Sequence, residues 1–243
     1  MNQPGVVDPL YILARRVLLD ALAALRPHKN ALILVGAQAI YLHTGPAGLA
    51  VAEHTTDADI ALAPHLLLNA PTLAEAIQAA GFRAAGTNVG SWVTRKPLGG
   101  KDVEVMVDLL VPEAVGGSGR RGARLGVHGN KTARKVKGLE AALVDKEEKL
   151  LASLDPADSR NFRVAVAGPT ALIISKLHKI ADRREDQGRL SDKDALDVLR
   201  LLRTTEAAAV AETWLKLISD KTAGAVSMEA VGLLERLFAL PGS

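Results

Sequence analysis

The segment AVAEHTTDADIAL (residues 50–62) places two carboxylates, Asp57 and Asp59, one residue apart at the start of an apolar run. On a β-strand, side chains alternate between two faces, so both acids share one face while Ala58 and Ile60 take the other. Like charges this close together are unfavourable unless a cation or a proton lies between them. The segment therefore predicts a strand with one buried face and one acidic face.

The chain before this segment predicts a second strand and a tight turn. The apolar run ALILVG (31–36) is typical of a buried strand, and Gly36 ends it. The following AQAIYLHTG (37–45) predicts a helix that stops at its terminal glycine. A strand, a glycine turn and a helix therefore lead directly into the strand that carries the acids.

A third acid stands on the clearest strand of the sequence, DVEVMVDLLV (102–111). Its valines at 103, 105, 107 and 111, with Leu109, share one face by the two-residue period. Asp108 leaves the strand on the opposite face. Mg²⁺ prefers oxygen ligands and is usually held by one or two carboxylates plus substrate phosphates. The three acids therefore predict a divalent-cation site, provided that the two strands are neighbours.

Elements elsewhere complete a two-part organisation. Asp8 and Pro9 cap a helix, PTLAEAIQAAGF (71–82) predicts another, and SWVTR (91–95) and FRVAVAG (162–168) predict strands. Four helices are expected over 169–186, over 191–203 with Ser191 as N-cap, over 206–218 and over 227–238. We expect an α/β (α+β) part, residues 1–167, with a mixed sheet flanked by helices, followed by a C-terminal helical bundle, residues 168–243.

Composition narrows the class of protein. The chain has 243 residues, 48% of them apolar, and a mean hydropathy of +0.14. It has no cysteine, which excludes disulfides and suits a reducing cytosol, and His43, His54 and His178 lack the spacing of zinc ligands. No run approaches the roughly 18 apolar residues of a membrane span, and no signal peptide is recognisable. We therefore expect a cytoplasmic protein without membrane partners.

The segment from Glu113 to Glu140 is basic, with seven Lys and Arg against two Glu, whereas the whole chain has a net charge of only +3. Such a segment is a candidate surface for nucleic-acid phosphates. A solvated loop is an equally good interpretation. The candidate nucleic-acid-binding residues are Arg120, Arg121, Arg124, Lys131, Arg134 and Lys135.

Three segments in this order, LVGAQAIYLHTG, TTDADIAL and VEVMVDLL, resemble the nucleotidyltransferase fold of the DNA polymerase β superfamily. Its pattern is Gly-Gly or Gly-Ser, then Asp-x-Asp, then a later Asp. The C-terminal stretch SKLHKIADRREDQGRLSDKDALDVLRLL is similar to the AbiEii-like toxin branch. Lys176, Arg183, Asp194 and Asp197 fall on the matching positions of that branch. The resemblance covers roughly residues 30–112 and 168–203.

This resemblance implies roles for the acids. Asp57 and Asp59 would hold Mg²⁺ (or Mn²⁺) and, through the metal, the triphosphate of an NTP. Asp108 would ligate the metal or accept the proton of the acceptor hydroxyl. Asp194 would orient Lys176 or support the nucleotide site.

The resemblance also implies which residues contact the nucleotide. Gly36, Ala37 and Gln38 form the turn that approaches the phosphates, and Lys176 would neutralise phosphate charge in the transition state. The turn departs from the family pattern, because Ala37 stands for Gly or Ser and Gln38 for a common Ser or Thr. The Gln38 amide would then donate to phosphate in place of a hydroxyl. Alternatively, Lys176 is a solvated helix residue, and Asp194 stands near the start of its helix only because the helix dipole stabilises an acid there.

We therefore expect a Mg²⁺-dependent nucleotidyltransferase that moves a nucleoside monophosphate from an NTP to an acceptor hydroxyl. The resemblance implies RNA as acceptor, such as a tRNA 3′ end, and the toxin of a toxin–antitoxin pair with a cognate antitoxin as partner. Two alternatives remain open. In the first, the same transfer has a protein or a small molecule as its acceptor. In the second, the chain is a catalytically silent binding module, and its altered Gly-Ala-Gln turn marks the loss of activity.

Overall fold

A computed structural model describes residues 7–45, 55–86, 88–184 and 192–238. Its strands are β1 (Leu32–Val35), β2 (Asp57–Leu62), β3 (Arg83–Ala84), β4 (Ser91–Leu98), β5 (Lys101–Pro112), β6 (Arg134–Val136), β7 (Lys146–Ala152) and β8 (Asn161–Ala167). Its α-helices are α1 (Pro9–Ala24), α2 (Gly36–Thr44), α3 (Leu73–Ala79), α4 (Pro169–Arg184), α5 (Asp192–Thr204), α6 (Ala207–Ile218) and α7 (Gly224–Phe238).

The strands form one mixed sheet in the order β3-β4-β5-β2-β1-β8-β7, with β6 paired to β5 outside this order. β2 runs parallel to β5 and antiparallel to β1, while β1 runs parallel to β8. The strands that carry the acids are therefore neighbours at the centre of the sheet. The mixed sheet flanked by helices and followed by C-terminal helices confirms the predicted fold class.

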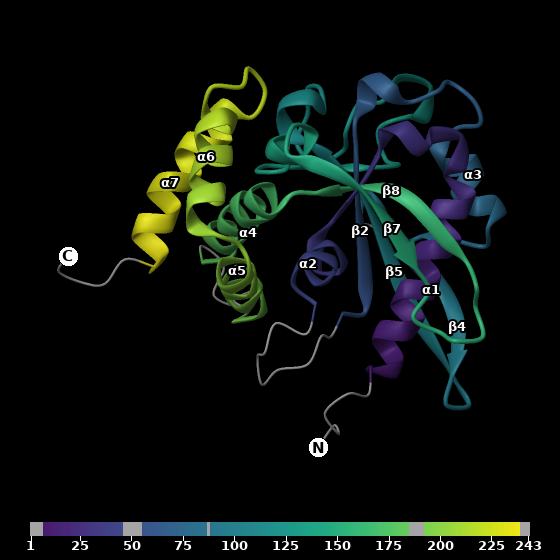
Figure 1. The fold of residues 1–243 in the computed structure, drawn as a ribbon. Coiled ribbons are helices and arrows are strands. Elements are labelled where there is room, and N and C mark those ends of the chain that lie inside the picture. The colour runs from purple at the N-terminus through teal and green to yellow at the C-terminus, as the bar shows by residue number, and fades with distance from the viewer. Residues whose placement is uncertain (1–6, 46–54, 87, 185–191, 239–243) are drawn as a thin grey trace.

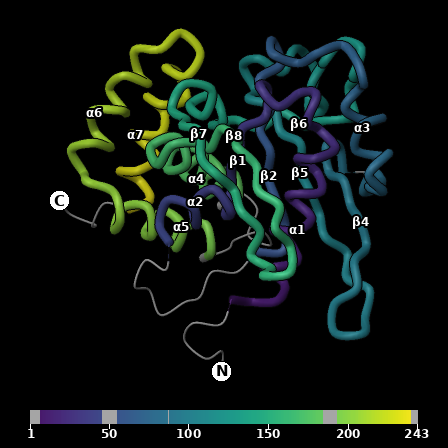
Figure 2. The backbone as a smooth tube through the Cα atoms, turned by 45° about the vertical axis from the view of Figure 1, so that its right-hand side comes forward, coloured from purple at the N-terminus to yellow at the C-terminus, as the bar shows by residue number. Residues whose placement is uncertain are grey.

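Helices cover both faces of the sheet. α1 and α3 lie on one side, whereas α2 and the C-terminal helices lie on the other (Figure 1). α1 packs on β2, β4 and β5, and α2 packs on β1, β2 and α5. Turned by 45°, the backbone shows the β4–β5 hairpin projecting beyond the body of the protein (Figure 2). No helix in the described ranges has both the length and the apolar character needed to cross a membrane.

Sequence signals explain where several helices begin. The Asp8 side chain accepts a hydrogen bond from the Leu10 N–H at 2.7 Å, and Pro9 occupies the first turn of α1, as predicted. Thr72 and Glu75 form a reciprocal capping box at the start of α3. The expected N-cap of α5, Ser191, lies outside the described residues.

The core forms where the predicted strand faces meet. Val107 and Leu109 on β5 and Ile60 on β2 have no solvent-exposed surface, so the face opposite the acids is buried as the alternation predicts. Leu34 on β1 is equally buried between β2 and β8. These side chains belong to one continuous hydrophobic cluster, which fixes the backbone from which the acids project.

Three strands were not predicted, and the shortest of them is β3, with two residues. β7, KEEKLLA, is mostly exposed and pairs only with β8, so its charged sequence lacks the apolar face by which strands are recognised. β6 has three residues and lies within the basic segment, for which a loop or an irregular hairpin is the expectation from the sequence. Its parallel pairing with β5 brings this segment back onto the sheet.

Leu34→Ala should lower the free energy of unfolding by about 2–5 kcal/mol, because it leaves a cavity in the centre of the sheet. Urea denaturation measures the difference. Leu150→Ala provides the matched control, since Leu150 lies on edge strand β7 and is 55% exposed. Its effect should stay within about 0.5 kcal/mol. Equal effects of the two substitutions would contradict the central position of β1.

Candidate active site

One row of residues crosses the middle of the sheet and carries the site. Asp59 on β2 pairs with Val35 on β1 and with Asp108 on β5, and Asp108 pairs in turn with Ser91 on β4. Directly paired residues of neighbouring strands project from the same face. Asp57 lies two residues from Asp59 and shares that face. The structure therefore brings the three predicted acids together on one face, beside the point where β1 becomes α2.

Gly36 allows the chain to turn directly over Asp59. Its φ is +69°, a conformation that glycine adopts without cost. A Cβ added to Gly36 would lie 2.0 Å from Asp59 Oδ2, so a side chain here collides with the carboxylate. The first turn of α2, whose N-cap residue Val35 makes no side-chain capping hydrogen bond, consequently lies beside the acids. A helix N-terminus in this position favours negative charge.

Burial and the neighbouring acids change the pKa of Asp59. Burial raises its pKa, and the neighbouring charge of Asp57 raises it further, to about 6. Lys179 acts in the opposite direction, followed by a smaller raising effect of Asp108 and a smaller lowering effect of Lys176. Asp59 therefore senses both other acids and the cations of α4. A titratable group of this kind is typical of functional sites.

Asp57 is held through its backbone and its side chain. The Thr55 hydroxyl donates to Asp57 Oδ1 at 2.6 Å. The Gln38 amide nitrogen donates to the Asp57 carbonyl at 3.2 Å, and Gln38 Oε1 accepts from Arg15 Nε at 2.8 Å. Gln38 and Arg15 are both buried. In this structure the Gln38 amide positions β2; contact with a phosphate stays a prediction for Gln38 and for Ala37, which is buried in the first turn of α2.

Asp108 has a donor on each carboxylate oxygen. The Ser91 hydroxyl donates to Oδ1 at 2.6 Å, and Arg134 Nη2 donates to Oδ2. The side chain of Asp108 is 13% exposed and that of Arg134 is 39% exposed. Ligation of a metal by Asp108 stays a prediction, and the geometry shows the carboxylate engaged by protein groups.

A buried ionic cluster joins α4 to α5. Lys176 Nζ lies 2.6 Å from Asp194 Oδ1 and 2.6 Å from Asp197 Oδ2. Arg183 Nη1 binds Asp194 Oδ2 at 2.6 Å, and Lys179 Nζ lies 3.4 Å from Asp194 Oδ1. Lys176 is only 5% exposed, so it is not a solvated helix residue. Asp194 contacts Lys176 as the family resemblance implies, and Asp197 binds Lys176.

The charges in this cluster stabilise one another. Burial acts to lower the pKa of Lys176, but Asp197 and Asp194 outweigh it and raise this pKa. Burial acts to raise the pKa of Asp194, but Lys176 and then Lys179 outweigh it and hold this pKa low. Lys176 and Asp194 are therefore both charged at neutral pH. Lys179 was not recognised in the sequence, although its spacing from Lys176 places both on one helix face.

Two of the three acids have the chemistry that a divalent cation requires. In the described part of the chain, no group of three or more His, Cys, Asp or Glu side chains is arranged to hold a metal ion. Mg²⁺ nevertheless needs only one or two carboxylates when substrate phosphates complete its shell. Asp57 and Asp59 meet that requirement, because they share one face and their mutual repulsion is relieved by a cation. These two residues fit the metal.

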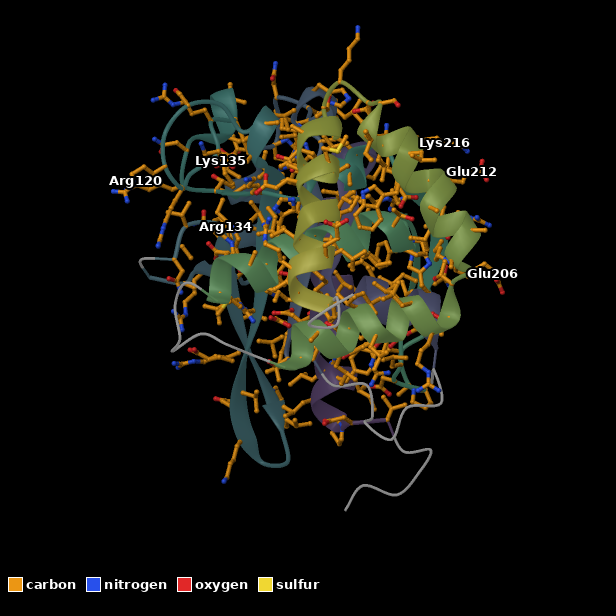
Figure 3. The ribbon with its side chains drawn as sticks, turned by 90° about the vertical axis from the view of Figure 1, so that its left-hand side faces the viewer. Arg120, Arg134, Lys135, Glu206, Glu212 and Lys216 are labelled. Atoms are coloured by element: carbon orange, nitrogen blue, oxygen red, sulfur yellow. The ribbon has the colours of Figure 1, made fainter. Side chains whose placement is uncertain are left out.

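The predicted nucleic-acid-binding residues separate into two groups. Arg120, Arg121, Arg124 and Lys131 are exposed. Figure 3 shows Arg120 pointing away from the protein, whereas Arg134 lies closer to its body. Lys135 Nζ donates to the Gly117 carbonyl at 3.0 Å and to the Gly119 carbonyl, so Lys135 also supports the loop itself. Contact of any of these residues with nucleic acid stays a prediction.

Four contributors to the site were missed. Arg15, Thr55, Ser91 and Lys179 hold or influence the acids, but no pattern in the sequence distinguishes any of them from its neighbours. Ser91 is the first residue of a predicted strand. Only the register between β4 and β5 reveals that it faces Asp108.

A mixed sheet with a strand, a glycine turn, a helix and an Asp-x-Asp strand defines an α/β protein whose site suits phosphate-bearing substrates. A family model described as "Nucleotidyltransferase" matches residues 15–219. The chain therefore belongs to this nucleotidyltransferase family, for which transfer of a nucleoside monophosphate is the general activity. The match does not identify the AbiEii-like branch, which stays a prediction. No curated protein and no solved structure matches the sequence.

Gly36→Ala should displace Asp59 as well as strain the backbone. We expect the free energy of unfolding to fall by about 2–4 kcal/mol, because a positive φ costs about 1–3 kcal/mol and the collision with the carboxylate adds to it. Gly81→Ala is the matched control, since Gly81 has a φ of +83° and open space around its Cβ position. Urea unfolding should show the smaller loss for Gly81→Ala. Equal losses of stability in the two variants would contradict the close contact between Gly36 and Asp59.

The raised pKa of Asp59 predicts a pH dependence of stability. Between about pH 4 and pH 6 the folded protein binds more protons at Asp59 than the unfolded protein, so the free energy of unfolding falls as pH rises through this window. In EDTA, Asp59→Asn should be about 3 kcal/mol more stable than the wild type at pH 8, because each pKa unit corresponds to about 1.4 kcal/mol, and the difference should disappear below about pH 4. Thermal unfolding across this range measures both effects. An Asp59→Asn variant less stable than the wild type at pH 8 would contradict the raised pKa of Asp59.

Proposed function

We propose that this protein is a Mg²⁺-dependent nucleotidyltransferase of the cytosol that transfers a nucleoside monophosphate from an NTP to a hydroxyl of RNA. The observation that carries the proposal is the shared face of Asp57, Asp59 and Asp108 beside the Gly36 turn, within a chain of the nucleotidyltransferase family. Paired carboxylates next to a helix N-terminus combine a cation site with a phosphate site.

The reaction forms one bond and breaks another at the same phosphorus. The acceptor oxygen attacks the α-phosphorus, its proton passes to water, and the bond to the β-phosphate breaks to release pyrophosphate. Asp57 and Asp59 would hold the metal, which when bound supplies positive charge to the phosphates. Gly36 leaves the first turn of α2 close to the substrate, and the cations of α4 add positive charge to the same region.

The cations of α4 differ in what they can offer a phosphate. Lys176 is enclosed by two carboxylates, so its contribution is to fix Asp194 and the helix pair. The side chain of Lys179 is 44% exposed, and its charge acts on Asp59 more strongly than that of Lys176. Lys179 is therefore the better placed of the two to meet a triphosphate bound at the acids.

RNA is favoured as the acceptor by the exposed arginines of the basic segment. Arg134 belongs to that segment and reaches Asp108, so the segment runs from the site to the exposed cations. An acceptor strand whose hydroxyl lies at the acids would place its phosphates along this surface. Binding through phosphates weakens steeply with salt. In this proposal the protein acts as the toxin of a toxin–antitoxin pair, with a cognate antitoxin as partner.

The test is transfer from α-labelled NTPs to total RNA in the presence of Mg²⁺. We expect labelled RNA with the wild type and a loss of about 100-fold or more with Asp57→Ala or Asp59→Ala, because charge stabilisation by a metal contributes several kcal/mol. Asp102→Ala, at the exposed start of β5, is the matched control and should retain activity within about twofold.

Treatment of the product with ribonuclease identifies the acceptor. Label that resists ribonuclease but yields to protease would replace RNA by a protein acceptor. Absence of transfer to RNA, protein and small-molecule hydroxyls, together with absence of Mg²⁺ binding, would contradict the enzyme and leave the silent binding module. Growth arrest on expression that Asp59→Ala abolishes would support the toxin role.

A further inference from the structure

Arg134 belongs to the basic segment in sequence, but in the folded protein it lies beside Asp108. β6 pairs with β5 so that Arg134 stands opposite Leu110, which is two residues beyond Asp108 and therefore on the same face. The guanidinium Nη2 donates to Asp108 Oδ2. The register of β6 against β5 thus places the positive charge of Arg134 beside Asp108.

The position of Arg134 is fixed by a close approach of the backbone. Gly90 has a φ of +81°, and a Cβ added to it would lie 2.5 Å from the Arg134 amide nitrogen and 2.7 Å from the Leu109 carbonyl. The Gly90 N–H donates to the Lys131 carbonyl at 3.2 Å, and Trp92 Nε1 donates to the Thr132 carbonyl at 3.0 Å. These bonds hold the strand that carries Arg134 against the sheet, so the ion pair is not a chance contact of a loose loop.

The ion pair bears on how many cations the site can accept. Both oxygens of Asp108 already have donors, Ser91 on one side and Arg134 on the other. In two-metal sites the ions lie about 3.5–4 Å apart and depend on carboxylates shared between them. A guanidinium in contact with Asp108 supplies positive charge where a second ion would otherwise bind. Asp57 and Asp59 are left as the carboxylates available to an external ion.

We propose that Arg134 is the resident cation of Asp108, so that the site takes one divalent ion, at Asp57 and Asp59, rather than two. Arg134 is then a positioning residue, which neutralises the third acid and keeps it from ligating metal. The inference rests on the proposed function, because it concerns the metal that the transfer reaction requires.

Mn²⁺ bound per chain decides the question. The full-length protein, freed of metal with EDTA, is mixed with a non-hydrolysable NTP analogue, and Mn²⁺ is titrated while electron paramagnetic resonance measures the free ion. We expect one bound Mn²⁺ per protein–analogue complex in the wild type and two in Arg134→Gln, with spin coupling between neighbouring ions. Arg134→Lys keeps the charge and should bind one.

Lys135→Gln is the matched control, because it removes one positive charge from the next residue, which donates to carbonyl groups and not to Asp108. It should bind one Mn²⁺. Asp108→Asn provides a second route if Arg134→Gln does not fold. It should still bind one Mn²⁺ with an affinity within about twofold of the wild type, whereas Asp59→Asn should lose it.

The outcomes distinguish a failure of the proposed role of Arg134 from a failure of the proposed function. Two Mn²⁺ in the wild type, one in a folded Arg134→Gln, or loss of Mn²⁺ in Asp108→Asn would each overturn the role of Arg134 while leaving the nucleotidyltransferase intact. A wild type that binds neither Mn²⁺ nor the analogue would instead overturn the proposed function. Far-ultraviolet circular dichroism of each variant establishes that it is folded.

Discussion

Electrostatic crowding on one face of the sheet governs this structure. Asp59 and Asp108 are direct neighbours in register and Asp57 lies one step along β2, so three carboxylates share a small area. Left alone they repel, and the pKa of Asp59, raised to about 6 by burial and then by Asp57, shows the cost. Hydrogen-bond donors and cations around the carboxylates offset this repulsion. These groups come from several elements of the fold: Ser91 from β4, Arg134 from β6, and Lys176 and Lys179 from α4.

Two kinds of compensation act at the two ends of the row. At Asp108, a hydroxyl and a guanidinium bind the carboxylate directly. At Asp59, the balancing charges come from α4, with Lys179 ahead of Lys176. The carboxylates are therefore not equivalent. Asp108 is paired with an arginine, whereas the charge of Asp59 is balanced at longer range by the lysines of α4.

The sequence was informative where a pattern lies within one element. The two-residue period of β2 and β5 predicted which residues are buried and that the acids share a face, because alternation is a local property. It could not predict the register between strands, which depends on pairing across the sheet. Ser91 and Arg134 meet Asp108 only through that register. Strand β7 was missed for a related reason, since an exposed edge strand needs no apolar face.

Helix α2 links these acids to the C-terminal helices. Gly36 touches Asp59, and Gln38 holds the Asp57 carbonyl. Farther along α2, the Tyr41 ring packs edge-on against Tyr11 of α1 with centroids 5.5 Å apart, and the buried Arg200 of α5 lies 5.5 Å from its centre. Because α5 also carries Asp194 and Asp197, which hold Lys176 and its helix α4, the cations that act on Asp59 are positioned through α2. The expected division at residues 167 and 168 therefore runs through one electrostatic arrangement, with the acids in the first part and the lysines that act on Asp59 in the second.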